Sequence, residues 1–164
     1  MKRIGIISDT HGWWDDRYVT YFKDCDEIWH AGDIGSEELA DRLAAIAPLR
    51  AVYGNIDGGA LRRRFNEVEV FTVEGVKVVM THIGGYPGRY APGIKAILLA
   101  ERPQLFISGH SHILKVMNDK WMGVLHINPG AAGMQGWQTV RTLVLLTIDN
   151  GTFADCEAIE LGGR

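Results

Sequence analysis

Short apolar runs recur along the chain, and most of them stop abruptly at a polar residue. The first run, Arg3–Ser8, is typical of a buried strand, and it is followed directly by Asp9 and His11. Apolar residues then return at helical spacing behind Ser36, which has a side chain typical of a helix N-cap, and Pro48 closes that segment. The pattern therefore predicts that strands and helices alternate through the first two thirds of the chain.

The predicted elements follow one another in a simple order. Strands are expected over Arg3–Ser8, Glu27–Ala31, Ala51–Tyr53, Val68–Val73, Val76–Thr81, Leu105–Ser108, Leu114–Asn118, Trp121–Ile127, Thr142–Ile148 and Thr152–Glu160. Helices are expected over Asp15–Lys23, behind Ser36 and over Ile94–Glu101, and Gly84–Gly93 is expected to be a loop. Alternating elements followed by strands alone predict a mixed α/β fold, with two sheets face to face and helices outside.

Length and composition are those of one globular domain. The 164 residues are 46% hydrophobic and 23% charged with a net charge of −3, so a single domain over residues 1–164 is expected. This charge gives no general attraction to nucleic acid or acidic membranes, and the basic cluster Arg62–Arg64 is interpreted as a solvated helix face. No apolar run approaches the roughly 18 residues that a membrane span needs. Cys25 and Cys156 form no CxxC pair, which favours a cytoplasmic location.

Five apolar runs end by presenting Asp, Asn or His, and none ends by presenting Lys or Arg. The residues at these ends are Asp9 and His11, Asp33, Asn55 with Asp57, His82, and His110 with His112. Ligands bind at the carboxyl ends of strands in open α/β sheets, so one site is expected there. Residues i and i+2 of an extended segment point to the same side. This spacing predicts that Asp9 and His11 reach one point, and that His110 and His112 do so as well.

The mixture of imidazole and carboxylate side chains predicts a site for transition metals such as Zn, Mn, Fe or Ni. The candidate ligands are Asp9, His11, Asp33, Asn55, His82, His110 and His112. Seven ligands exceed what one tetrahedral zinc ion needs, so two ions that share a ligand are predicted. Gly32, Gly54 and Gly109 stand just before key side chains, where they allow sharp turns and close approach of the backbone. Unrelated polar turns and buried histidines are the alternative, and the repetition at five strand ends argues against it.

The motifs, taken in chain order, resemble those of the calcineurin-like metallophosphoesterase superfamily. The matching blocks are Asp9-Thr10-His11, Gly32-Asp33, Gly54-Asn55-Ile56-Asp57, Thr81-His82, Gly109-His110-Ser111-His112 and Asn128-Pro129-Gly130. The length and the GNxD form are most similar to its small bacterial and archaeal phosphodiesterase branch. The resemblance implies a four-layer α/β/β/α sandwich of two mixed sheets flanked by helices, with a dinuclear metal site at one rim.

The resemblance also implies roles for the candidate ligands. One ion would be held by Asp9, His11 and His112, the other by Asn55, His82 and His110, and Asp33 would bridge them. A hydroxide between the ions would attack phosphorus in line, with Asp33, Asn55 and His82 as catalytic residues. The implied protein is a cytoplasmic phosphodiesterase that hydrolyses small or aryl phosphodiesters with two ions of manganese, iron, nickel or zinc. A small phosphate ester is the expected partner, without nucleic acid or membrane, and a homo-oligomer is left open.

Two positions depart from the family pattern. Many members carry His after the metal-binding Asn, where it resembles a general acid, but this chain has Ile56, and Asp57 is the candidate to replace it. Members usually show His-Gly after the fourth strand, whereas here Ile83 follows His82. A non-catalytic binding scaffold, similar in architecture to the retromer subunit of eukaryotes, is the second hypothesis. The filled ligand positions favour the enzyme, and no basic groove signature supports a nuclease.

Other conspicuous residues have two interpretations each. Trp13-Trp14 either stacks on an aryl or nucleobase group or anchors the first helix. Arg89-Tyr90 either clamps a substrate phosphate or belongs to a plain surface loop. His30 is expected to support the site from behind or to lie in the core, and His126 is expected in the core.

Overall fold

Strand β1, Lys2–Ile7, lies at the centre of the first of two five-stranded sheets in the computed structural model, which describes residues 1–164. The other strands of this sheet are β2 (Glu27–His30), β3 (Leu49–Ala51), β11 (Val140–Asp149) and β12 (Thr152–Gly163). Their order across the sheet is β12-β11-β1-β2-β3. Because β1 runs parallel to β2 and antiparallel to β11, the sheet is mixed.

The second sheet is formed by the middle of the chain and is also mixed. Its strands are β4 (Val68–Val73), β5 (Val76–Thr81), β8 (Leu105–Ile107), β9 (Leu114–Asp119) and β10 (Val124–Pro129). They lie in the order β4-β5-β8-β10-β9, with β5, β8 and β10 parallel and the two edge strands antiparallel. The pairing of β4 with β5 confirms the predicted hairpin around Glu74-Gly75.

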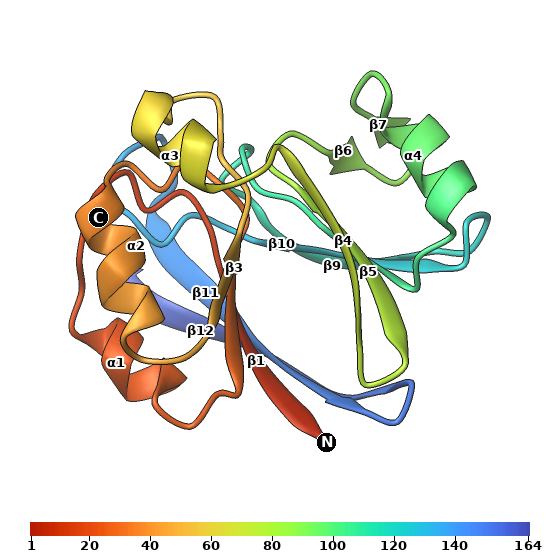
Figure 1. The fold of residues 1–164 in the computed structure, drawn as a ribbon, viewed down its shortest axis with the longest axis horizontal. Coiled ribbons are helices and arrows are strands. Elements are labelled where there is room, and N and C mark those ends of the chain that lie inside the picture. Colours follow the sequence, from red (N-terminus) through yellow and green to blue (C-terminus); the bar gives the residue numbers. More distant parts are fainter.

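Three layers of apolar side chains separate four layers of backbone. Neighbouring residues of β1 point to opposite faces, so that Ile6 lies between the two sheets whereas Ile7 faces the helices. Helices α1 (Arg17–Phe22) and α2 (Glu37–Ala44) cover the first sheet, and α4 (Ile94–Glu101) packs on the second (Figure 1). The predicted α/β/β/α sandwich of two mixed sheets is therefore confirmed.

Helix boundaries follow the capping signals of the sequence. Ser36 Oγ accepts a hydrogen bond from the backbone N–H of Leu39 at 3.2 Å, and two glutamates occupy the first turn, where the helix dipole stabilises carboxylates. Helix α4 covers the predicted residues and ends at Arg102, which adopts a left-handed conformation. None of the helices has the length and apolar character that crossing a bilayer requires.

The segment Gly84–Gly93, predicted to be a loop, contains a two-stranded hairpin. Its strands are β6 (Gly85–Tyr86) and β7 (Arg89–Tyr90), which pair antiparallel. Gly85 and Gly88 have positive φ angles, which glycine adopts without steric cost. Strands of two residues are too short to show any periodic pattern, so the sequence predicts only the turn-forming glycines and not the pairing.

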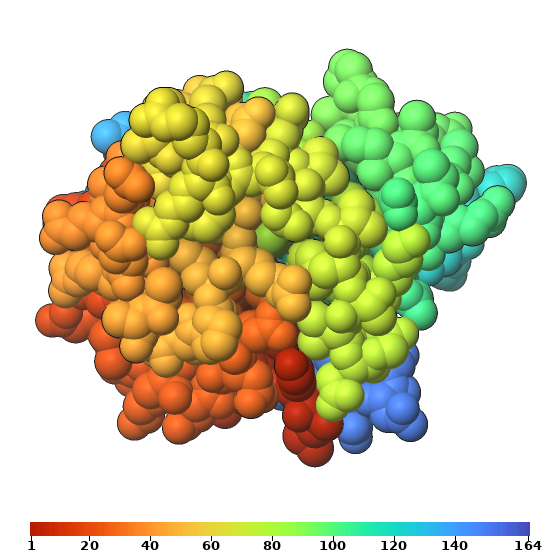
Figure 2. Space-filling model, viewed as in Figure 1, coloured from red at the N-terminus to blue at the C-terminus, as the bar shows by residue number.

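Several strand boundaries also differ from the prediction. The strand expected to begin at Trp121 begins at Val124, because the Asp119 carboxylate accepts the N–H groups of Trp121 and the next residue and so closes a turn. Strand β3 begins two residues before the predicted strand Ala51–Tyr53. Helix α3 (Gly59–Arg64) then follows, and the space-filling view shows its yellow atoms set apart from the green atoms of α4 along the upper rim (Figure 2).

Candidate metal centre

The loops that follow the strands of both sheets meet at one rim of the sandwich. The backbone N–H of His11, after β1, donates to the carbonyl of Asp33, after β2, at 3.0 Å. In the second sheet, the N–H of Gly109, after β8, donates to the carbonyl of His82, after β5, at 2.9 Å. The strand ends therefore lie side by side, as expected for the carboxyl ends of parallel strands.

Six of the seven candidate ligands form two adjoining groups. The first cluster is Asp9, His11 and His112, and the second cluster is Asp33, His82 and His110, with the ligand atoms of each cluster within 4.8 Å of one another. Asp33 contacts both clusters, because its Oδ2 atom lies 3.5 Å from His11 Nε2 and 3.2 Å from His82 Nε2. Asn55 joins the second cluster through its Oδ1 atom, 3.1 Å from Nδ1 of His110. The structure thus brings all the predicted ligands together.

Three buried ligand atoms have no hydrogen-bond partner in the protein. They are Asp9 Oδ1, His11 Nε2 and His82 Nε2, and the carboxylate oxygen lies 3.8 Å from each of the two nitrogens. Buried polar atoms are normally paired, because an unpaired one loses its contacts with water and gains none in the fold. Carboxylate oxygens and imidazole nitrogens are ligands that suit divalent transition metals. The residues therefore fit such ions.

The backbone presents most of these ligands in an unusual conformation. Asp9, His11, Asp33, His110 and His112 all have positive φ angles. Residues other than glycine rarely adopt this left-handed region, at a cost of about 1–3 kcal/mol each, and such strain is concentrated at functional sites. The prediction assumes that these ligands lie in extended segments, where residues i and i+2 point to the same side. The left-handed backbone shows that this assumption is wrong. Asp9 and His11 do meet in one cluster, but His110 and His112 enter different clusters.

Glycines beside the ligands allow the close approach that the sequence predicts. A Cβ atom on Gly54 would collide with the backbone nitrogen and the carboxylate of Asp33. A Cβ atom on Gly109 would likewise collide with Ser8 Oγ, which donates to Asp9 Oδ2 at 2.6 Å. The backbones that carry the two clusters can pack this tightly only because these positions lack side chains.

Two ligand histidines are oriented through their second ring nitrogen. His82 Nδ1 donates to the carbonyl of Ala31 at 2.7 Å, and His112 Nδ1 donates to Gln138 Oε1 at 2.8 Å. The Nε2 atom of each neutral ring is then free of a proton, which is the state that binds metal. Gln138 itself donates to the carbonyl of Gln135 at 2.7 Å, which fixes its own orientation. Sequence reasoning missed Gln138, because a lone glutamine in a loop shows no pattern.

The carboxylates and imidazoles shift one another's pKa values. Burial alone would raise the pKa of Asp9, but the close contacts of its carboxylate with the imidazoles of His11 and His112 outweigh burial and hold it well below its usual range. Burial likewise opposes the shifts at Asp33 and His82, yet the 3.2 Å contact between carboxylate and imidazole lowers the pKa of the carboxyl and raises that of the imidazole. The 3.1 Å contact with the carboxylate of Asp9 raises the pKa of His112. Both carboxylates are therefore charged at neutral pH, and a metal ion competes with protons for the imidazoles.

Asp57, the candidate to replace the missing general acid, has a different role. Its carboxylate is buried and accepts the backbone N–H groups of Ile34 at 3.2 Å, Gly35 at 2.9 Å and Gly54 at 2.8 Å. Both oxygens act as acceptors, which leaves no proton for a leaving group. The prediction for Asp57 is wrong: this residue ties the loop after β2 to the loop that carries Asn55.

The remaining histidines lie behind the site or in the core, as predicted. His30 is buried, its Nδ1 atom accepts the N–H of Gly32 at 3.0 Å, and its Nε2 atom donates to Thr10 Oγ1 at 3.0 Å. It therefore supports the loop before Asp33 without facing the clusters. His126 is buried on β10, with Nε2 2.9 Å from Ser108 Oγ. Burial lowers the pKa of each ring to about 4, so both are neutral at pH 7.

The aromatic residues near the site are mostly structural anchors. Trp14 packs edge-on against Tyr18 of α1, with ring centroids 5.4 Å apart, so the helix-anchor interpretation holds for it. Trp13 is exposed and contacts no other aromatic ring. The hydroxyl of Tyr90 donates to Asp119 at 2.6 Å and fastens the β6–β7 hairpin to β9, which agrees with the surface-loop interpretation rather than a phosphate clamp.

The basic cluster Arg62–Arg64 is exposed on α3, as predicted, and its first member also contacts the site loop. The guanidinium of Arg62 donates to the carbonyl of Asp57 at 2.7 Å and to that of Asn55 at 3.3 Å. It also lies over the ring of Tyr53, 4.7 Å from the centroid. Arg62 is therefore exposed, as predicted, and in addition holds the loop that presents Asn55.

Comparisons with known proteins agree with this geometry. A family model described as the calcineurin-like phosphoesterase superfamily domain matches residues 1–151. A probable metallophosphoesterase from Methanothermobacter thermautotrophicus is 29% identical over 171 residues, which cover 97% of this chain and 92% of that relative.

Solved structures share the fold over nearly the whole chain. A Vps29 from Entamoeba histolytica complexed with Zn²⁺ has a TM-score of 0.72 at 20% identity, and the match covers 96% of this chain and 98% of that one. A structure described as a novel archaeal phosphodiesterase has a TM-score of 0.71 at 23% identity, covering 97% of this chain and 99% of that one. At these identities the comparison concerns the fold, and function has to be argued from the site.

Proposed function

The chain belongs to the calcineurin-like phosphoesterase superfamily, and we propose that it is a metal-dependent phosphodiesterase that hydrolyses small or aryl phosphodiesters. The observation that carries this proposal is the meeting of two ligand clusters at Asp33, where three buried ligand atoms have no partner in the protein. The proposed cofactors are two divalent transition-metal ions of Mn, Fe, Ni or Zn. Asp9, His11 and His112 would hold one ion, Asn55, His82 and His110 the other, and Asp33 both.

Divalent ions, when bound, would polarise the phosphoryl oxygens and lower the pKa of a water molecule so that it can act as the nucleophile. The protein contributes the arrangement of ligands. Ala31 and Gln138 hold the Nδ1 protons of His82 and His112, so that both Nε2 atoms face the carboxylates. Only Asp9 and Asp33 bring negative charge, which does not cancel that of two divalent ions, and an anionic phosphodiester is attracted to the site.

The absence of a positioned proton donor supports aryl esters as substrates. Ile56 stands next to Asn55, where many members of the superfamily carry a histidine, and its side chain has no proton to give. Asp57 is occupied by three backbone N–H groups. In-line attack places negative charge on the leaving oxygen, and phenols tolerate this charge better than aliphatic alcohols because they are more acidic. Acidic leaving groups therefore suit this site.

A non-catalytic binding scaffold is the second candidate, and one comparison favours it. Vps29, a vacuolar protein sorting protein, has the same fold and is complexed with Zn²⁺ in the Entamoeba structure. Bound metal alone therefore does not separate a hydrolase from a scaffold. Turnover of substrate does.

We also propose a cytoplasmic location and a small phosphate ester as the partner, without nucleic acid or membrane. Cys25 is buried and Cys156 exposed, and neither forms a disulfide, which suits a reducing compartment.

The decisive experiment combines metal analysis with a panel of phosphate monoesters and diesters. We expect the purified protein to bind two equivalents of transition metal and to hydrolyse bis(4-nitrophenyl) phosphate. A chelator should remove the activity, and added Mn²⁺ or Zn²⁺ should restore it. His82→Gln tests the ligand set, and His126→Gln is the matched control in the core. Full metal content without hydrolysis of any ester would contradict the proposal and favour the scaffold.

A further inference from the structure

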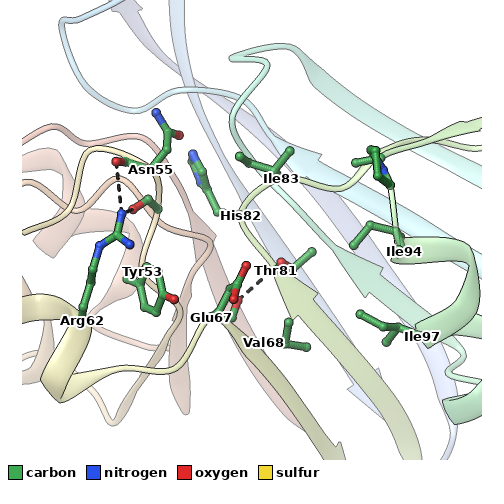
Figure 3. A pocket seen from close by; sticks show the side chains of 14 residues that line it. Tyr53, Asn55, Arg62, Glu67, Val68, Thr81, His82, Ile83, Ile94 and Ile97 are labelled. Atoms are coloured by element: carbon green, nitrogen blue, oxygen red, sulfur yellow. Dashed lines mark hydrogen bonds between the residues drawn. The ribbon is translucent and has the colours of Figure 1, made fainter.

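A cavity of about 540 Å³ opens beside the second cluster, and neither the ligand set nor the proposed chemistry uses it. Its walls come from the loop after β3, from α3, from the end of β5 and from the first turns of α4 (Figure 3). Asn55 and His82 belong to this lining, so a molecule bound at the second cluster can extend a substituent into the cavity. The volume lies within the range of small-molecule sites.

Arg62 brings to this cavity a guanidinium that forms no ion pair. Its Nε and Nη2 atoms donate to backbone carbonyls, whereas its Nη1 atom makes no hydrogen bond and the guanidinium forms no ion pair. Figure 3 shows the guanidinium beside Asn55 at the metal-centre side of the cavity. Because the contacts with the backbone and Tyr53 already order the side chain, its free donors can bind a phosphoryl oxygen with little further loss of entropy.

The rest of the lining combines apolar side chains with one unpaired carboxylate. Ile94 and Ile97 of α4 lie across the cavity from Arg62 and Tyr53 (Figure 3). Glu67 is the only acidic residue of the lining, and its carboxylate makes no hydrogen bond or ion pair within the protein. This carboxylate is exposed to water, and beside an apolar wall it can accept hydrogen bonds from a ligand that is mostly apolar and carries a donor.

We propose that this cavity is the subsite for one ester group of the phosphodiester, and that it selects an apolar group carrying a hydrogen-bond donor such as a primary amine. This inference rests on the proposed function, because it assumes that phosphorus lies at the metal centre. Arg62 donates to a phosphoryl oxygen, the isoleucines contact the apolar body, and Glu67 accepts from the amine. Ile83, the residue that departs from the family pattern, also lines the cavity, so this departure belongs to the subsite.

The first experiment measures binding to the metal-free protein, where the cavity is present and no hydrolysis occurs. The probes are phenol, 4-(aminomethyl)phenol and 4-hydroxybenzoate, followed by the NMR shifts of the isoleucine methyl groups. We expect 4-(aminomethyl)phenol to bind about threefold more tightly than phenol, as an exposed ion pair allows, and 4-hydroxybenzoate to bind most weakly. Glu67→Gln should abolish this preference, and Glu69→Gln, two residues further along the chain in β4 and outside the lining, should retain it.

The second experiment fills the cavity. Ile97→Trp should weaken binding of both phenols at least tenfold and lower kcat/KM for diphenyl phosphate and bis(4-(aminomethyl)phenyl) phosphate to a similar extent. Symmetric diesters are used because either ester group can then enter the subsite. Leu99→Trp is the matched control, since Leu99 is exposed on the same helix and lies outside the lining.

The binding and hydrolysis measurements distinguish a failure of the subsite from a failure of the proposed function. Equal binding of the phenols to the wild-type protein and to Ile97→Trp, or a wild-type protein without preference for the amine, would overturn the subsite. Selective binding that Ile97→Trp removes would support it even in a protein that hydrolyses no ester, and only the proposed function would then fail.

Discussion

The two ligand clusters share Asp33, but the protein holds the first far more firmly than the second. In the first cluster, Asp9 is completely buried, and its Oδ2 atom accepts a hydrogen bond from Ser8 Oγ at 2.6 Å. His112 is held by Gln138 at 2.8 Å. These ligands are ordered by the fold itself, so binding an ion costs them little further entropy.

In the second cluster, only the inner part is fixed. His82 is buried and tied to a backbone carbonyl, whereas His110 and Asn55 are exposed and contact each other at 3.1 Å. The second cluster also opens onto the cavity that Arg62 lines. We infer that the first cluster is suited to retain an ion and the second to present one to substrate. We therefore expect the first cluster to bind its ion more tightly.

The largest effect is expected where the two clusters meet. Asp33→Asn keeps the volume of the side chain and removes the negative charge that contacts both clusters. We expect the affinity for both ions to fall and kcat/KM to drop by about 10³-fold or more, because metal chemistry supplies several kcal/mol of transition-state stabilisation. Metal analysis and diester hydrolysis check this, with His126→Gln as the control. Two full equivalents of metal with normal activity would show that Asp33 is not shared.

A smaller effect is expected for the residue that fixes the first cluster. Gln138→Leu removes the acceptor of the His112 Nδ1 proton, and such outer contacts typically change metal affinity by about 10–100-fold. Competition titration with a chelator should show that the tighter of the two sites is weakened. Gln135→Leu in the same loop is the control, since the side chain of Gln135 is exposed and only its carbonyl is used. Weakening of the looser site instead would reverse the comparison.

The sequence predicts the location of the site better than its internal geometry. Each ligand follows an apolar run, so the ends of β1, β2, β3, β5 and β8 could be brought together from the strand pattern alone. The left-handed conformation of Asp9 or His110 could not, because it depends on loops from different strands that hydrogen-bond to one another. The separation of His110 from His112 follows from the same turns.

The roles of residues that act through backbone contacts could not be predicted from the sequence either. The sequence offers Asp57 only as a candidate proton donor, and its three backbone partners come from two loops that only the fold brings together. Arg62 looks in sequence like any arginine on an exposed helix. Sheet order and capping, in contrast, depend on local patterns, and there the prediction succeeded at Ser36 and over Ile94–Glu101.

The loss of activity at low pH tests both clusters at once. Asp9 raises the pKa of His112 in the first cluster, and Asp33 raises the pKa of His82 in the second. In the metal-free protein, these protonated imidazoles stabilise the fold fully below pH ~6.5, and the contribution is lost as the pH rises through the raised pKa values. Metal binding needs the neutral rings, so its affinity should start to fall above pH ~6.5 on acidification, by about tenfold per pH unit for each proton displaced.

The measurement is bound metal and activity between pH 5 and 8 at several metal concentrations. Both should fall together, with the looser ion leaving first, and excess metal should move the acid limb to lower pH. An acid limb that does not respond to metal concentration would mean that another group titrates.

The smallest effect is expected at Ile56, next to the exposed part of the second cluster. A positioned general acid contributes about 10²–10⁴ in rate, and neither Ile56 nor Asp57 can supply one. We therefore expect kcat/KM to fall steeply as the pKa of the leaving phenol rises across a series of substituted phenyl phosphodiesters. Ile56→His should raise the rates of the poorest leaving groups by about fivefold, well short of the full range, because a side chain that is 48% exposed is not held in place by packing. Ile56→Gln controls for polarity without a titrating proton. A flat dependence in the native protein would mean that bond cleavage is not rate-limiting or that another group donates the proton, and the role assigned to Ile56 would then be wrong.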